Sequence, residues 1–149
     1  MRKGFENLLS GLVKPAWIDQ NGHMNVVFYM RIFDKGMDRM LRLIGFSDEL
    51  VKKERYTIVA SRINIIHRKE LLRDEPWQLD GGLLTVNSRY LTFVHRLSSK
   101  NTVRAYCYIR GVVFCTSHRA SRVLDDYVLD KAKQFVVAGL IDPFEMPRS

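Results

Sequence analysis

The hydrophobic repeat of the chain changes near residue 55, from a helical period to alternation. Residues 25–44 carry apolar side chains three and four positions apart, as on one face of an α-helix. Other apolar residues flank this stripe, which predicts a helix embraced by a sheet rather than one on the surface. The stripe comprises Tyr29, Phe33, Met37, Met40, Leu41 and Ile44, flanked by Phe28, Met30, Ile32 and Leu43. Gly45 is a stop signal, and a short helical turn is expected over 47–54.

After residue 55 the apolar and polar residues alternate, as in strands that bury one face. Asn87 and Ser88 form one tight-turn candidate, and the stretch 98–101 forms another. Because these links are short, the consecutive strands predict an antiparallel meander. The expected strands cover 56–69, 76–87, 89–99 and 102–117.

The two ends of the chain complete the predicted order of elements. An apolar run predicts a first strand at about 11–18, and a turn-rich stretch follows it. Residues 120–140 carry a second helical pattern, and 141–149 predict irregular structure. A strand, a long helix, four strands and a final helix indicate the α+β class. We therefore predict a single domain over 1–149, with a core at about 8–118 and a helical extension at about 120–140.

Composition narrows the class of protein. The chain has 149 residues, of which 46% are hydrophobic and 27% charged, a globular balance. Its apolar stretches are far shorter than the ~20 residues that span a bilayer, and the N-terminus does not resemble a signal peptide. If Cys107 and Cys115 share a strand, ~3.3 Å per residue places them about 26 Å apart, too far for a disulfide. Two unpaired cysteines favour a reducing compartment, so we expect a cytoplasmic protein without a membrane partner.

The net charge of +8 and the sequence pI of about 9.7 indicate an affinity for anions. Nucleic acid, anionic lipid and a small polyanion such as coenzyme A all fit, and charge alone does not choose between them. A well-solvated basic surface is the plainer explanation. No block of five or more like charges is present, so the chain has no basic tail.

The familiar catalytic motifs are missing from the sequence. There is no Gly-x-Ser-x-Gly elbow, no Walker loop, no Gly-rich dinucleotide fingerprint and no Cys or His spacing typical of zinc. We therefore predict no metal and no cofactor.

One stretch, Trp17–Asn25, combines a carboxylate, a glycine and the start of the long helix. The first turn of a helix leaves N–H groups without intrahelical partners, and these can hold an anion or a developing oxyanion. An ionised Asp19 beside them can deprotonate water or attack a carbonyl. Gly22 lets a backbone approach closely. The competing interpretation makes Asp19 an N-cap or a turn former.

The motif Asp19-x-x-Gly22-His23-Met24-Asn25, with Tyr29 inside the helix, resembles the signature of the 4-hydroxybenzoyl-CoA-type thioesterases of the hotdog superfamily. The segment 63–71 and the following Asp-Glu-Pro also resemble the second strand and acidic turn of that family. The resemblance implies a hotdog fold, a homodimer or homotetramer, and active sites at subunit interfaces. It implies that Asp19 is the general base or nucleophile, and that amides near Asn25 and Val26 form the oxyanion hole. Many relatives carry a second Asn where this chain has Val26, so only a backbone donor would be retained there.

Other candidate residues have equally plain structural explanations. His23 can orient Asp19 or the loop, or simply serve as a structural hydrogen-bonding residue. Phe28 and Tyr29 can line an acyl pocket or belong to the core. Five basic residues can bind the phosphates of coenzyme A, or each can be a solvated surface charge. They are Arg62, His67, Arg68, Arg119 and Arg122.

The sequence therefore predicts an acyl-CoA thioesterase for a small or medium acyl group. The residues of the Asp19–Asn25 motif are similar to those of thioesterases that act on short or charged acyl groups, including betainyl-CoA. Trp17, Phe28, Tyr29 or Trp77 would bind such a quaternary ammonium by cation–π contact. The alternatives are a hotdog hydratase or dehydratase and a non-catalytic acyl-CoA-binding module. No motif supports nucleic-acid binding, since the aromatic residues are not interleaved with Lys or Arg.

Overall fold

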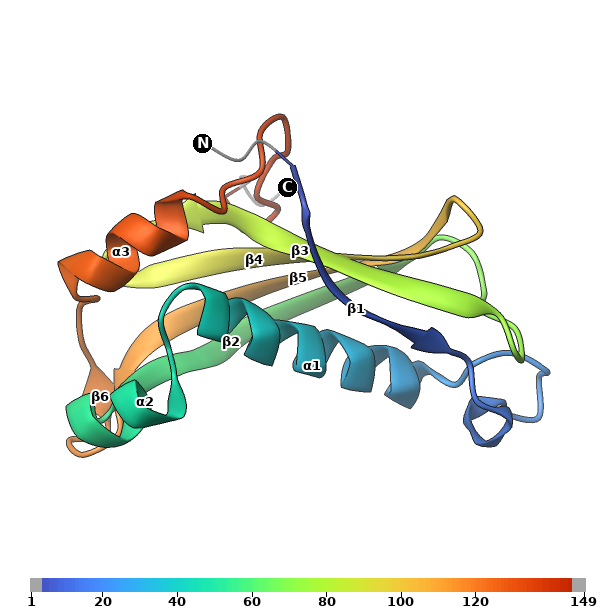
Figure 1. The fold of residues 1–149 in the computed structure, drawn as a ribbon, viewed down its shortest axis with the longest axis horizontal. Helices are drawn as coiled ribbons and strands as arrows, with labels where there is room; N and C mark the ends of the chain where they lie inside the picture. The colour runs from blue at the N-terminus through green and yellow to red at the C-terminus, as the bar shows by residue number, and fades with distance from the viewer. Residues whose placement is uncertain (1–3, 146–149) are drawn as a thin grey trace.

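A long helix, α1, lies along one face of a curved antiparallel sheet (Figure 1). The structure is a computed structural model and describes residues 4–145. In chain order its elements are β1 Glu6–Leu12, the 3-10 helix η1 Pro15–Trp17, α1 Val26–Leu43, α2 Asp48–Glu54, β2 Tyr56–His67, β3 Pro76–Val86, β4 Tyr90–Ser99, β5 Thr102–Cys115, β6 Ala120–Ser121 and α3 Asp126–Lys133. This is the α+β hotdog fold that the resemblance implies.

The sheet has the strand order β1-β3-β4-β5-β2, and every neighbouring pair is antiparallel. The meander predicted for β3, β4 and β5 is thus confirmed. Strand β2 pairs with β5 from Tyr56 opposite Cys115 to His67 opposite Ala105, and it forms one edge of the sheet. The short β6 pairs with the end of β5. The register places the start of β5 beside the end of β2, at the same end of the sheet as the start of α1 (Figure 1).

The core lies between α1 and the inner face of the sheet. The buried face of α1 includes Tyr29, Phe33 and Met40, as the helical spacing predicts. Alternate residues of the strands meet it, among them Leu79 and Phe93. The sequence prediction of α1, α2 and the strands β2 to β5 is confirmed to within two residues at each end.

Two predicted elements were wrong. The strand expected at 11–18 lies at Glu6–Leu12, because Pro15 starts a 3-10 turn and cannot donate a ladder hydrogen bond. The helix expected over 120–140 is only Asp126–Lys133. Beyond it, the amide of Leu83 donates to the carbonyl of Phe135 and the amide of Val137 donates to that of Leu83, so this segment lies alongside β3 in a parallel bridge.

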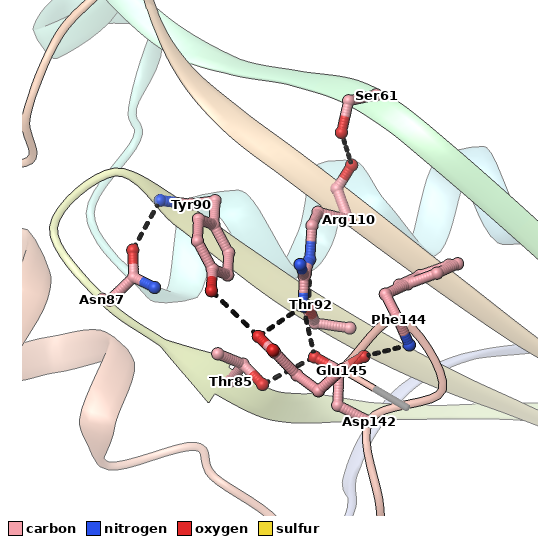
Figure 2. A network of polar contacts seen from close by, with 9 residues as sticks. All are labelled: Ser61, Thr85, Asn87, Tyr90, Thr92, Arg110, Asp142, Phe144 and Glu145. Carbon is pink, nitrogen blue, oxygen red and sulfur yellow. Dashed lines mark hydrogen bonds and ion pairs between the residues drawn. The ribbon is translucent and has the colours of Figure 1, made fainter. Parts of the chain in front are cut away.

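The last described residues are fastened to the face of the sheet opposite α1 (Figure 2). The guanidinium of Arg110 contacts Asp142 at 2.8 Å and Glu145 at 2.9 Å. Thr85 donates to Asp142 and Tyr90 donates to Glu145. The predicted irregular structure is confirmed for 141–145, and 146–149 lie outside the described residues.

Cys107 and Cys115 both lie on β5, and neither forms a disulfide, as their spacing predicts. Among the helices of residues 4–145, none is long and apolar enough to cross a membrane.

Candidate functional site

The loop between η1 and α1 is a small hairpin that fixes Asp19. Ile18 and Met24 form an isolated antiparallel bridge. Inside it, the Asp19 amide donates to the carbonyl of His23 at 3.1 Å, and the Gly22 amide donates to the carbonyl of Asp19 at 3.0 Å. Gly22 has φ of +79°, a conformation that side chains with a Cβ rarely adopt. The glycine of the motif is therefore required by the turn itself.

The Asp19 carboxylate is held by two neighbours and is 16% exposed. Its Oδ1 accepts a hydrogen bond of 2.8 Å from the Asn21 amide, which is the turn-forming role that was the alternative interpretation. Its Oδ2 lies 3.4 Å from Nδ2 of Asn25, toward the start of α1. The N-cap is Asn25 and not Asp19, because Oδ1 of Asn25 accepts from the Val27 amide at 3.0 Å. Asn25 thereby links the carboxylate to the first turn of the helix.

The start of α1 presents a backbone donor near this carboxylate. The amides of Val27 and Phe28 are both bonded to Asn25. For the amide of Val26 no hydrogen-bond partner is found within residues 4–145, and its side chain is 58% exposed. Because the side chain of Asn25 is already engaged, the candidate oxyanion donor is the Val26 backbone.

A cavity of about 730 Å³ opens beside this loop. Its wall includes Tyr29, which is buried, and burial raises the pKa of the Tyr29 hydroxyl. That hydroxyl accepts a hydrogen bond of 3.1 Å from the Leu71 amide, and the ring packs edge-on against His67 at 4.7 Å. The lining residues are His23, Met24, Val26, Tyr29, His67, Arg68, Lys69 and Glu70.

The connection between β2 and β3 is locked against the Asp19 loop. The Met24 amide donates to the carbonyl of Leu71 at 2.8 Å. Arg104, only 3% exposed, donates to the carbonyl of Glu70 at 2.7 Å and to both carboxylate oxygens of Glu75 at 3.1 Å. The bonds from Arg104 lower the pKa of Glu75 to about 2. Two distant parts of the chain thus form one rigid wall.

His23 lies between two carboxylates at the cavity wall. Its Nδ1 is 3.1 Å from Oε2 of Glu70, and its Nε2 is 3.9 Å from Oδ2 of Asp19. Asp19 is not among the residues that line the cavity, whereas His23 is. Glu70 was not predicted as a functional residue, since it stands 47 residues from His23 in the sequence.

The aromatic residues predicted to bind an acyl group lie partly in the cavity and partly outside it. Tyr29 lines the cavity, whereas Phe28 stacks on Trp17 at 5.3 Å and lies outside the lining. Lys14 lies over the Trp17 ring and Arg31 lies over the Phe28 ring, each 5.5 Å from the centroid. These rings therefore already contact cations of the chain itself.

The five basic residues predicted for coenzyme A do not form one site within a chain. His67 and Arg68 line the cavity. Arg62 lies 4.6 Å from the Phe144 ring, whereas Arg119 and Arg122 follow the far end of β5. Arg104 lies near the start of β5, beside the end of β2 that leads to His67 and Arg68. Eleven residues of strand separate Arg104 from the other end of β5, or about 36 Å at ~3.3 Å per residue. Of the five, only His67 and Arg68 therefore lie at this cavity, and a role of any of them in binding coenzyme A stays a prediction. Within residues 4–145, no three His, Cys, Asp or Glu side chains gather as metal ligands.

The family model of the thioesterase-like superfamily matches residues 13–147, and the chain belongs to that superfamily. A hypothetical protein from Staphylococcus aureus, solved in complex with CoA, is similar with a TM-score of 0.86 and 16% identity over 100% of this chain and 97% of its own. YbaW, a probable thioesterase from Escherichia coli, has a TM-score of 0.74 and 16% identity over 88% and 99% of the two chains. A gentisyl-coenzyme A thioesterase has a TM-score of 0.73 and 13% identity over 85% and 99%. These likenesses establish the hotdog fold. A search of curated proteins gives no match.

Proposed function

We propose that the protein hydrolyses an acyl-CoA thioester, with Asp19 as the general base. The observation that carries the proposal is the link from the Asp19 carboxylate through Asn25 to the start of α1. A water activated by Asp19 attacks the carbonyl carbon, and the Val26 amide stabilises the negative oxygen that forms. Attack by Asp19 itself is the alternative. Single-turnover hydrolysis in ¹⁸O-labelled water detects direct attack when water opens the resulting mixed anhydride at the Asp19 carbonyl, because the label then stays on Asp19.

The cavity beside Asp19 supports coenzyme A as the carrier of the acyl group. Arg68 and Lys69 supply positive charge there, and His67 adds a further hydrogen-bonding group. A relative of this fold was solved with CoA, and another is a gentisyl-coenzyme A thioesterase. Arg68→Ala should raise KM for acyl-CoA more than it changes kcat. A panel of acyl-CoA substrates, betainyl-CoA included, then defines the acyl group.

A second copy of the chain completes the site in this proposal. Val26, which carries the proposed oxyanion donor, is 58% exposed in the single chain, and the next residue, Val27, is 55% exposed. Apolar side chains beside a catalytic carboxylate favour a partner surface, because exposed apolar patches commonly mark interfaces. We therefore propose a homodimer or homotetramer in the cytoplasm.

The direct test is Asp19→Asn. This change keeps the size of the side chain and removes its charge, so we expect thioester hydrolysis to fall by about 10²–10⁴-fold. Release of free thiol from acyl-CoA gives the rate, and circular dichroism checks the fold. Asp130→Asn, which removes a carboxylate from the exposed face of α3, is the control and should keep full activity. Unchanged hydrolysis by Asp19→Asn removes Asp19 from the mechanism.

A hydratase is the second candidate, favoured by the placement of His23 beside Asp19 at 3.9 Å. Hotdog hydratases resemble this arrangement in using a histidine with a carboxylate. Hydration of crotonyl-CoA by the wild-type protein, without thiol release, would select this alternative.

A further inference from the structure

The roles proposed for Asp19 and Val26 do not account for the two carboxylate neighbours of His23. The imidazole joins two loops that are far apart in sequence, with Glu70 at its Nδ1 and Asp19 near its Nε2. A neutral imidazole carries one proton, and the hydrogen bond made by one nitrogen determines which nitrogen keeps it. A carboxylate only accepts hydrogen bonds, so Glu70 places the proton of neutral His23 on Nδ1. The lone pair of Nε2 then faces Asp19.

Glu70 holds this position because its backbone is fixed. Its carbonyl accepts from buried Arg104 at 2.7 Å, and the next residue, Leu71, is bonded to Met24 and to the Tyr29 hydroxyl. The residues on either side of the His23–Glu70 contact are thus tied together by main-chain bonds. The side chain of Glu70 is 53% exposed, so replacing it leaves the core unchanged.

We propose that Glu70 is a positioning residue and that His23 carries the proton from Asp19 to the departing thiolate. The proposal rests on the proposed thioesterase function and deepens it. Thioester hydrolysis with a general base leaves a proton on Asp19 and a negative charge on sulfur. A proton acceptor 3.9 Å from Asp19, at the wall of the cavity, can serve both.

Asp19 removes a proton from water, and the new oxygen–carbon bond forms the tetrahedral oxyanion. The proton passes from Asp19 to Nε2 of His23 through one water, since the 3.9 Å between the two atoms exceeds a direct hydrogen bond. Glu70 stabilises the imidazolium that results. Collapse of the oxyanion breaks the carbon–sulfur bond, and the electron pair leaves on sulfur. The sulfur takes the proton from Nε2, which returns Asp19 and His23 to their starting states with a carboxylic acid and a thiol as products.

The test compares two leaving groups in Glu70→Ala. A coenzyme A thiolate needs a proton, whereas a p-nitrothiophenyl thioester of the same acid releases a stable thiolate that does not. We expect kcat for the acyl-CoA to fall about tenfold with KM within about twofold, as loss of positioned proton transfer predicts. The rate with the p-nitrothiophenyl thioester should change by less than about twofold. Glu70→Gln keeps an acceptor for Nδ1 and should retain most of the rate.

Glu49→Ala is the matched control, because it removes an exposed glutamate from α2, away from the cavity. An equal loss with both leaving groups in Glu70→Ala, or no loss with either, overturns the proposal while the thioesterase function stands. A wild-type protein that cleaves neither thioester overturns both.

A second measurement needs no turnover. ¹⁵N spectra of labelled histidine report which ring nitrogen carries the proton. We expect Nδ1–H for His23 in the wild type and in Glu70→Gln, and a shift toward Nε2–H in Glu70→Ala. Nε2–H in the wild type would overturn the assignment of Glu70.

Discussion

Arg104 and Glu75 form an almost fully buried ion pair, with side chains 4% and 10% exposed. Hydrogen bonds from Arg104 lower the pKa of Glu75 from 4.5 to about 2. Because the folded state binds the proton more weakly than the unfolded state, the pair stabilises the fold above about pH 4.5. That contribution is lost as the pH falls toward 2.

Glu75→Gln should therefore lower the free energy of unfolding at neutral pH by about 2 kcal/mol, since it leaves the Arg104 charge buried with weaker partners. The difference from wild type should shrink between pH 4.5 and pH 2, where wild-type Glu75 takes up its proton. Urea unfolding at several pH values measures both effects. Glu49→Gln on α2 is the control and should follow the wild-type curve. A variant that keeps a constant deficit down to pH 2 would contradict the assignment.

At the residue scale, the candidate site residues that the sequence groups together are near one another in the chain. Asp19, Gly22 and Tyr29 lie in one motif, and the structure places them in one loop and the first turn of α1. Glu70 and Arg104 were missed because they reach the loop only through the pairing of β2 with β5. The register between strands that are distant in the chain depends on how their side chains pack, and this packing cannot be inferred from a single sequence.

Among the elements, α1 and the sheet approach each other closely at Gly36. A Cβ built there would lie 2.4 Å from Cδ2 of Leu79 and 2.9 Å from Cδ2 of His95, which is fully buried. Alanine raises helix propensity by about 1 kcal/mol over glycine, but overpacking a core costs about 1–3 kcal/mol. We expect the steric clash to outweigh the gain in helix propensity, because His95 is fully buried in a closely packed core.

Gly36→Ala should thus lower the free energy of unfolding by about 1–2 kcal/mol, and thermal unfolding measures the change. Lys52→Ala, at an exposed position of α2, is the control and should be neutral within about 0.5 kcal/mol. A Gly36→Ala protein as stable as wild type would show that the Leu79 side chain moves aside without lowering the free energy of unfolding.

The elements predicted well are those with a long, unbroken hydrophobic period, namely α1 and the strands β2 to β5. The errors fall where the same apolar residues fit two structures. Val136 and Val137 read as part of a helix, yet they lie against β3, where hydrogen bonds to Leu83 compete with those of a helix. Near the start of the chain, the apolar residues around Pro15 fit the pattern of a strand, although Pro15–Trp17 form a 3-10 turn.

At the scale of the whole molecule, no strand of the described residues 4–145 pairs with the outer edge of β2. Strand β2 runs for 12 residues along that edge, and a groove of about 690 Å³ separates it from α1. Ile63 and Met30 line this groove, and Ile63 is 48% exposed. Long apolar edges invite pairing, and natural proteins cover them. In the proposed oligomer, a second copy of the same chain would cover the groove and also supply the surface expected beside Val26.

Ile63→Lys tests this arrangement, because it places a charge where the two copies would meet. We expect the wild type to sediment as a dimer or larger, and the variant to shift toward the 17.4 kDa chain. Loss of a central apolar contact costs about 2 kcal/mol or more, which weakens association by about 30-fold. Thiol release should fall with dimer content and recover at high protein concentration, since both copies contribute to the active site in our proposal. Val123→Lys, at an apolar position that is 44% exposed near β6, should change neither property. A wild-type protein that sediments only at 17.4 kDa and still hydrolyses acyl-CoA would place the complete site in one chain.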